Sequence, residues 1–278
     1  MDRNDLMELV QDAFRTFPGN AVAPEAAITP DLAGMVLFEA PLVGVANAAD
    51  PIFLTYQQEG VVGPWHMLPG DWLPGAKAVI SLFFPFTEAV KEGERKAPPC
   101  ETSAQWLHGR IEGQEYLAAL LKEISRRLTQ AGVQNCVPCV DPRFKVGRGR
   151  PVPGYDVRTY GSTWSERHAA YACGLGTFGL CKGIITEKGM AGRFGSIIVD
   201  IPLEADIRPY TGVYDYCIMC GACVRRCPAG AVDMETGKDH DKCAGRLDQS
   251  EIDYAPRYGC GKCQTAVPCE SRNPSRKD

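Results

Sequence analysis

The residues best suited to chemistry are eight cysteines in the last 62 residues of the chain. Half of them follow the spacing Cys-x2-Cys-x2-Cys-x3-Cys-Pro, which places three thiolates on one [4Fe–4S] cluster and the fourth on a second cluster. Gaps of two residues let consecutive sulfurs reach neighbouring irons, and the proline turns the chain away. Two clusters need eight thiolates. The run comprises Cys217, Cys220, Cys223 and Cys227, and Cys243, Cys260, Cys263 and Cys269 follow it.

The spacing predicts how these cysteines divide between two clusters. Cys269 departs from the usual pattern, because five residues separate it from Cys263 and a proline precedes rather than follows it. Disulfides are an alternative, but the chain has thirteen cysteines and begins without a secretory segment. Zinc is another, but the run packs too many thiolates for one tetrahedral ion. We expect one cluster on Cys217, Cys220, Cys223 and Cys269, and the other on Cys227, Cys243, Cys260 and Cys263.

Five cysteines lie outside this group. The pair Cys136-x2-Cys139 has the spacing of a redox-active motif, but its segment resembles a strand, and no helix N-terminus is present to lower a thiol pKa. We therefore expect Cys136, Cys139, Cys173 and Cys181 to be buried, unreactive thiols. The role of Cys100 is not indicated by its surroundings.

Two further segments resemble ligand-binding motifs. Residues 174–179 match the dinucleotide fingerprint G-x-G-x-x-G, but a helix precedes them and a strand-like segment follows, which reverses the order a Rossmann site needs. We expect instead a tight helix-to-strand turn, where the backbone approaches something flat or bulky. Residues 142–150 carry four basic side chains. This loop is either a solvated surface or a phosphate-binding loop for a nucleotide-tailed cofactor or RNA.

The elements that must position these residues can be read from apolar periodicity. Helices are predicted from Asn4 to Phe17, from a Thr102–Gln105 capping box to Gly132, and from Ser162 or Thr163 to Gly174. Strands are predicted at 36–38, 42–45, 78–84, 133–140 and 196–201. We expect an α+β fold, in α/β layers, for residues 1–212 (the main segment). Residues 213–278 (the cluster segment) are expected to form a small bacterial-ferredoxin-like domain with two clusters in place of a core.

Composition limits the classes of function. The apolar content of 45% and charged content of 23% are typical of a soluble globular protein. The net charge of −4 gives no reason to expect DNA as a partner. No apolar run is long enough to span a membrane. Thiolate clusters in a chain that begins without a leader indicate a reducing cytoplasm.

Several of these features together resemble the epoxyqueuosine reductase family, which consists of cobalamin-dependent iron–sulfur reductases related to reductive dehalogenases. The resemblance is carried by Ser165-Glu-Arg167, Gly174-Leu-Gly176, Gly179 and residues 194–200, followed by the eight cysteines in order. It implies a nitroreductase-like main domain that holds cobalamin. It also implies that the two clusters deliver electrons to that cofactor one at a time.

The resemblance also implies site residues. Gly174, Gly176, Gly179 and Ile184 would lie close to the corrin, although a flavin is an alternative occupant. Tyr160 stands six residues before Glu166, where tRNA epoxyqueuosine reductases have an aspartate and where a dehalogenase-like tyrosine would serve as the acid. Its phenol would need a cation nearby, from Arg158 or Arg167. The alternative is a structural tyrosine ahead of a helix.

Three functions remain open on the sequence. The first is a cytoplasmic cobalamin-dependent reductase of a small molecule or modified nucleoside, supplied with electrons by a low-potential donor such as ferredoxin or flavodoxin. The second is an electron-transfer protein that serves a separate enzyme. The third is a tRNA epoxyqueuosine reductase that uses Tyr160 in place of aspartate.

Overall fold

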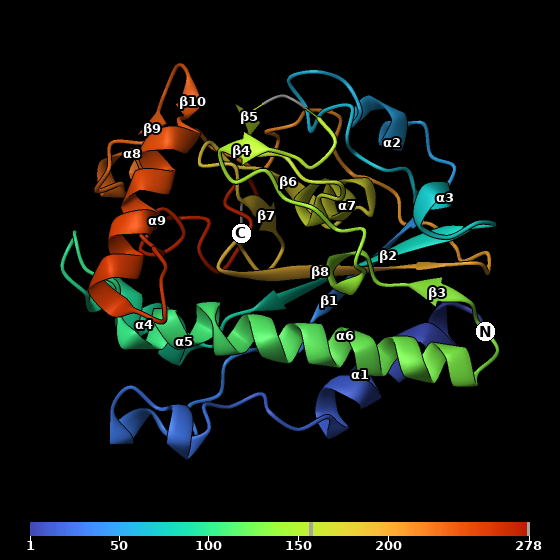
Figure 1. Ribbon diagram of the computed structural model, residues 1–278, viewed down its shortest axis with the longest axis horizontal. Helices are drawn as coiled ribbons and strands as arrows, with labels where there is room; N and C mark the ends of the chain where they lie inside the picture. Colours follow the sequence, from blue (N-terminus) through green and yellow to red (C-terminus); the bar gives the residue numbers. More distant parts are fainter. Residues whose placement is uncertain (156–157, 277–278) are drawn as a thin grey trace.

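A four-stranded antiparallel sheet lies at the centre of the computed structural model, which describes residues 1–155 and 158–276, with the side chain of Arg158 also outside the description (Figure 1). The strand order is β1-β2-β8-β3. Every neighbouring pair is antiparallel, with Leu42 opposite Phe83 and Ala78 opposite Val199. The strands are β1 (Leu42–Asn47), β2 (Ala78–Pro85), β8 (Gly192–Val199) and β3 (Asn135–Cys136).

The central strand β2 explains how the sheet is buried on both faces. All eight of its residues are buried, as its unbroken apolar run predicted. Ile80 and Leu82 point into the core on one face, whereas Val79 and Phe83 point into separate clusters on the other. This alternation follows from the two-residue period of a strand.

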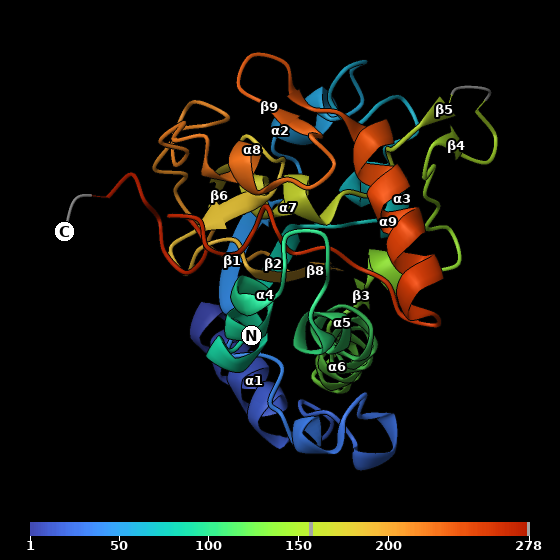
Figure 2. The same ribbon diagram turned by 90° about the vertical axis from the view of Figure 1, so that its left-hand side faces the viewer.

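Helices cover the first face of the sheet (Figures 1 and 2). Asp2 caps the first helix by accepting from the Asp5 backbone N–H. The helix predicted from Thr102 to Gly132 is in fact two helices that meet at Ile111, and Ser103 rather than Thr102 caps the first of them. The prediction placed the cap one residue early because both hydroxyls precede the apolar stripe. These elements are α1 (Arg3–Thr16), α4 (Glu88–Lys96), α5 (Ala104–Arg110) and α6 (Glu112–Gln130).

Shorter elements cover the opposite face. Trp164 packs there with its Nε1 donating to Ser196 Oγ at 2.8 Å. The helix predicted from Ser162 or Thr163 begins only at Glu166. The elements on this side are α2 (Ile52–Thr55), α3 (Pro69–Trp72), α7 (Glu166–Ala172), the hairpin β6 (Gly176–Phe178) with β7 (Ile184–Thr186), and the ribbon β4 (Arg150–Pro151) with β5 (Arg158–Thr159).

The cluster segment contributes little regular structure. Figure 2 shows α8 on the side of the sheet opposite α1, α5 and α6. The elements are α8 (Ala222–Arg226), β9 (Val232–Asp233), β10 (Gly237–Lys238) and α9 (His240–Tyr254).

Two of the predicted strands contain less regular strand structure than expected. Residues 36–38 form only isolated bridges, from Val36 to Ala21 and from Phe38 to Phe86. Of residues 133–140, only β3 is a strand, and Pro138 starts a short 3₁₀ turn, because a proline has no N–H for the sheet. In the parts of the chain that the structure describes, no helix combines the length and apolar character needed to cross a membrane.

Candidate metal centre

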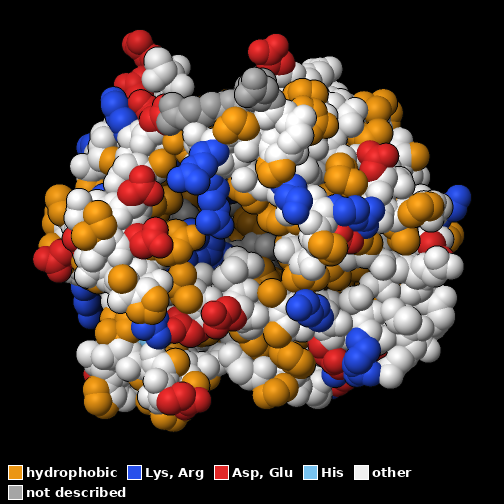
Figure 3. All heavy atoms as spheres, viewed as in Figure 1, with side chains coloured by type: hydrophobic (Ala, Val, Ile, Leu, Met, Phe, Trp, Pro, Cys, Tyr) orange, Lys and Arg blue, Asp and Glu red, His pale blue; other side chains and the backbone are white. Residues whose placement is uncertain are grey.

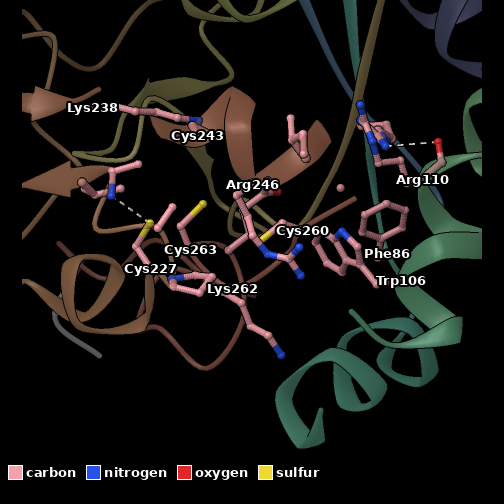
Figure 4. Close-up of a pocket in the computed structure, with 18 of the residues that line it drawn as sticks. Phe86, Trp106, Arg110, Cys227, Lys238, Cys243, Arg246, Cys260, Lys262 and Cys263 are labelled. Carbon is pink, nitrogen blue, oxygen red and sulfur yellow. Dashed lines mark hydrogen bonds between the residues drawn. The ribbon is translucent and has the colours of Figure 1, made fainter. Parts of the chain in front are cut away.

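The structure gathers the eight cysteines of the cluster segment around two hollows. The first hollow also has apolar walls from the main segment, including Ile185 and Met190. The second hollow has a volume of about 200 Å³ and lies between the two segments (Figure 4). Their use as cluster ligands stays a prediction, but the grouping is the one expected from the spacing. Cys217, Cys220, Cys223 and Cys269 line the first hollow, and Cys227, Cys243, Cys260 and Cys263 line the second.

Local backbone structure sets the positions of the first cysteines. Gly221 adopts a φ of +68°, a conformation that favours glycine, and α8 starts directly after it. The Ala231 N–H donates to Cys227 Sγ at 3.2 Å. Cys243 lies in the first turns of α9, which Asp239 caps by accepting from the Lys242 N–H at 3.0 Å. Most of this geometry is therefore local.

A buried carboxylate of the main segment holds the loop that carries Cys260 and Cys263. The Glu94 side chain is fully buried, and its Oε1 accepts from the Gly261 N–H at 3.0 Å. Its Oε2 accepts from the Ser103 N–H at 2.8 Å. The Lys262 ammonium lies 3.7 Å from Glu94 Oε1, and burial lowers the Lys262 pKa. Sequence reasoning missed Glu94, since nothing in the helical pattern of 88–96 marks a contact with residue 261.

The main segment also holds Cys269, the cysteine with the unusual spacing. The Met190 N–H donates to the Cys269 carbonyl at 2.9 Å, and the Arg95 guanidinium pairs with Glu270 at 2.8 Å. A Cβ on Gly189, which has a φ of +78°, would come within 2.3 Å of the Glu270 carbonyl oxygen. Contacts across the chain therefore place Cys269, and a regular spacing is not required.

Burial keeps several of these thiols protonated in the absence of a metal. It raises the pKa of Cys260 to about 11 and that of Cys269 to about 12. A metal that binds here must displace protons, because thiolates are the ligands. Among the described residues, no group of three or more His, Cys, Asp or Glu side chains is arranged to hold a single metal ion.

The second hollow has a strongly basic lining. Three of its guanidinium groups, those of Arg110, Arg193 and Arg246, have a buried Nε for which no hydrogen-bond partner is found among the described residues. Burial, together with Arg110, lowers the pKa of Arg193 to about 9. Figure 3 shows Lys and Arg side chains gathered along a hollow in the middle of one face of the molecule. A cubane with four thiolates is an anion, so the lining suits it. The basic residues are Arg110, Arg167, Arg193, Lys238, Arg246 and Lys262.

Tyr160 reaches the cluster segment. Its hydroxyl donates to Asp241 Oδ1 at 2.7 Å, and its ring stacks on His240 with centroids 5.2 Å apart. Both partners are in the first turn of α9, just before Cys243. The sequence analysis predicted that a cation, from Arg158 or Arg167, lies beside the phenol. Arg167 lines the second hollow, and the Arg158 side chain lies outside the described residues.

The glycine motif forms the expected helix-to-strand turn, and it faces protein atoms. A Cβ on Gly176 would lie 1.9 Å from the Ile185 carbonyl oxygen, and one on Gly174 would lie 3.2 Å from Asp206 Cβ. Ile184 is 1% exposed and packs within an apolar cluster. Gly179 lines the first hollow, but the groups nearest the three glycines, those of Ile185, Met190 and Asp206, belong to the main segment. These positions offer no cradle for a corrin, and their role in binding a cofactor stays a prediction.

The remaining cysteines and the basic loop are largely structural. Cys173 is buried as expected, whereas Cys136 and Cys139 are only half-buried; burial still raises the pKa of Cys136 to about 11 and raises that of Cys139 further. Cys100 is exposed. In the basic loop, Arg143 pairs with Asp141 and donates to the Trp72 carbonyl. Cys181 differs from these thiols, because it lines the first hollow.

Comparison with known proteins supports an iron–sulfur protein. Residues 210–233 match the family model described as a 4Fe-4S binding domain. The chain is 26% identical to the epoxyqueuosine reductase of Staphylococcus aureus over 213 residues, which are 70% of this chain and 49% of that protein. It is 28% identical to the enzyme of the same name from Salmonella typhimurium over 216 residues, 72% of this chain and 50% of the relative. The chain therefore spans about half the length of these curated relatives.

Solved structures share the fold. An epoxyqueuosine reductase with a tRNA-Tyr epoxyqueuosine-modified tRNA stem loop superposes with a TM-score of 0.56 at 18% identity, covering 96% of this chain and 65% of that one. A catabolic reductive dehalogenase superposes with a TM-score of 0.51 at 16% identity, covering 84% and 30%. The resemblance inferred from the motifs is thus confirmed. The mixed α/β fold with a 4Fe–4S segment near its end is confirmed as well, while the nitroreductase-like layering stays a prediction.

Proposed function

We propose that this chain is an iron–sulfur reductase with one [4Fe–4S] cluster in each hollow, which delivers electrons to an acceptor at the mouth of the second hollow. One observation carries the proposal. The second hollow combines four predicted cluster ligands with six basic side chains drawn from both segments. An anionic acceptor that entered this hollow would meet the cluster and the cations together.

The residues of the chain have separate tasks in this proposal. The cysteines hold the clusters, and each cluster passes one electron at a time, so two clusters together can supply a two-electron reduction. The guanidinium groups of Arg110 and Arg193 orient and neutralise the acceptor. The Tyr160–Asp241 pair, beside the ligand Cys243, is placed to hold a proton near the second cluster.

We further propose cobalamin as the acceptor, on the strength of the family resemblance. When bound, cobalamin supplies a cobalt centre that stores reducing equivalents. The turn at Gly176 and Ile184 does not fit a corrin, because both residues pack against the chain itself. The basic mouth of the second hollow fits better, since its Arg110, Arg193 and Arg246 can bind the phosphate of the nucleotide tail.

An anaerobic titration tests the proposal. The protein is reconstituted with iron and sulfide, its iron is counted, and cob(II)alamin is added while absorbance and EPR spectra are recorded. About eight irons per chain and a base-off cobalt signal are expected. An Arg193→Met variant should bind cobalamin more weakly at the same iron content. Eight irons with an unchanged cobalt spectrum would refute the cobalamin site and favour an electron-transfer protein.

A second candidate is a tRNA epoxyqueuosine reductase. It is favoured by the names of the sequence relatives and by the tRNA stem loop in a structure of similar fold. The basic lining of the second hollow would suit a phosphate backbone as well as a cofactor. Complementation of a queuosine-deficient strain tests this candidate directly. Failure by the wild-type chain, when expressed with its iron, would exclude it.

A further inference from the structure

A ninth cysteine, Cys181, lies among the predicted cluster ligands, although it belongs to the main segment. Its side chain is buried and lines the first hollow together with four predicted ligands. Its Sγ lies 3.7 Å from the carbonyl oxygen of Cys263, which belongs to the other ligand set. The Cys181 thiol also lies 3.8 Å from the Met190 Sδ, and Cys223 and Cys263 pack against the apolar cluster to which Cys181 belongs. Cys181 therefore lines the hollow of the first ligand set and contacts a residue of the second set.

The fold holds Cys181 firmly in this position. It is part of a tight turn closed by hydrogen bonds from the Gly179 N–H to the Gly183 carbonyl at 2.7 Å and from the Lys182 N–H to the Gly179 carbonyl at 2.8 Å. Lys182 has a φ of +65°, which a side chain rarely adopts. Its ammonium group donates to the Tyr214 hydroxyl at 2.7 Å, which ties the turn to the cluster segment. The turn therefore fixes the Cys181 side chain beside the first hollow.

We propose that Cys181 is a positioning and tuning residue of the two-cluster centre: its thiol contacts the Cys263 backbone and, from the wall of the first hollow, would donate a hydrogen bond to a sulfur of the cluster held there. The inference rests on the proposed function, since it assumes clusters on both ligand sets. A hydrogen bond to a cluster sulfur stabilises the reduced cluster, which carries one more negative charge, and so raises its reduction potential. The other main-segment side chains that line the first hollow are apolar, so the Cys181 thiol is the polar side chain that this segment brings to the cluster site.

Redox titration of Cys181 variants tests the inference without any acceptor or substrate. Reconstituted wild-type protein, Cys181→Ala and Cys181→Ser are titrated anaerobically, and the EPR signals of the two clusters are followed separately. In Cys181→Ala we expect about eight irons per chain and a more negative potential for the first cluster, with a smaller shift for the second. Cys181→Ser keeps a donor and should restore the potential toward the wild-type value.

Cys173 provides a matched control. It is as deeply buried, but its thiol donates to the Val79 carbonyl at 3.3 Å, and it lines neither hollow. Cys173→Ala should leave both potentials unchanged. Unchanged potentials in Cys181→Ala would overturn the inference, as would a loss of about four irons in both Cys181 variants, which would make Cys181 a ligand. Both results leave the proposed function standing, whereas wild-type protein without clusters would refute the proposed function itself.

Discussion

Replacing Glu94 by alanine should weaken the attachment of the second cluster site to the main segment. The Glu94 carboxylate and the Lys262 ammonium form a buried pair, with side chains 0% and 2% exposed. The carboxylate also accepts from the backbone N–H groups of Ser103 and Gly261. Glu94→Ala would leave a buried ammonium without its counter-charge and two N–H groups without their acceptor.

The size of the loss of stability depends on the hydrogen bonds that the Lys262 ammonium keeps in the variant. Removing one partner of a buried ion pair costs about 3–5 kcal/mol. The Lys262 Nζ keeps two acceptors, the carbonyls of Glu94 and Ala97 at 3.1 and 2.9 Å. We therefore expect a loss near the lower end of that range, about 3 kcal/mol. Because Gly261 lies between Cys260 and Cys263, the variant should also hold about four irons instead of eight.

Anaerobic urea unfolding followed by tryptophan fluorescence, together with iron analysis, measures both effects. The double variant Glu94→Met/Lys262→Met removes both charges and should recover the part of the loss that comes from the unpaired ammonium, while the Ser103 and Gly261 N–H groups still lack their acceptor. Glu92→Ala is the matched control on the same helix, since its pair with Lys96 is exposed and should contribute nothing measurable. A Glu94→Ala protein with eight irons and the wild-type unfolding midpoint would refute this reasoning.

Three further predictions concern single side chains. Tyr160→Phe should keep all the iron but lower turnover at least tenfold, because the phenol bound to Asp241 is the proposed acid. A steady-state assay, run once a substrate is found, measures this effect. An unchanged rate would make Tyr160 a structural residue. Gly176→Ala should destabilise the fold by more than about 2 kcal/mol, because its Cβ would lie 1.9 Å from the Ile185 carbonyl oxygen; thermal unfolding at the wild-type temperature would contradict this. Burial lowers the pKa of His66 from 6.5 to about 4, so the unfolded chain takes up a proton first as the pH falls. The free energy of unfolding should thus drop by about 1.5 kcal/mol between pH 6.5 and 5, and His66→Gln should remove that part of the pH dependence.

Local patterns allowed much of the fold to be predicted. The unbroken apolar run at 78–84 identified the central strand, and the capped, periodic sequence after Asn4 identified α1. The break at Ile111 was not predicted, because the apolar stripe continues across it and only the packing of two helices reveals it. The strand predicted at 133–140 was too long, because Pro138 interrupts the sheet.

The features of the candidate site likewise divide into those that local sequence patterns predicted and those that depend on long-range contacts. The short gaps of the run predicted that Cys217, Cys220 and Cys223 share one hollow and that Cys227 lines the other, whereas the place of Cys269 depends on contacts with the main segment. The contacts of Glu94 with residue 261, of Arg95 with Glu270 and of Tyr160 with Asp241 join residues more than 80 positions apart, and no periodicity encodes them. The position of Cys181 beside the first hollow depended on the turn that carries it. A thiol inside a glycine-rich turn was the available signal.

The hold of the main segment on Cys269 bears on whether the cluster segment can be moved to another protein. The Met190 N–H and the Arg95 guanidinium, both outside residues 213–278, fix the chain around Cys269. A fusion that carried only residues 213–278 would contain all eight cysteines but would lack the groups that place the eighth. Grafting the cluster segment onto a new enzyme would therefore require the residues around Met190, ahead of β8, and helix α4, which bears Arg95, to be transferred as well.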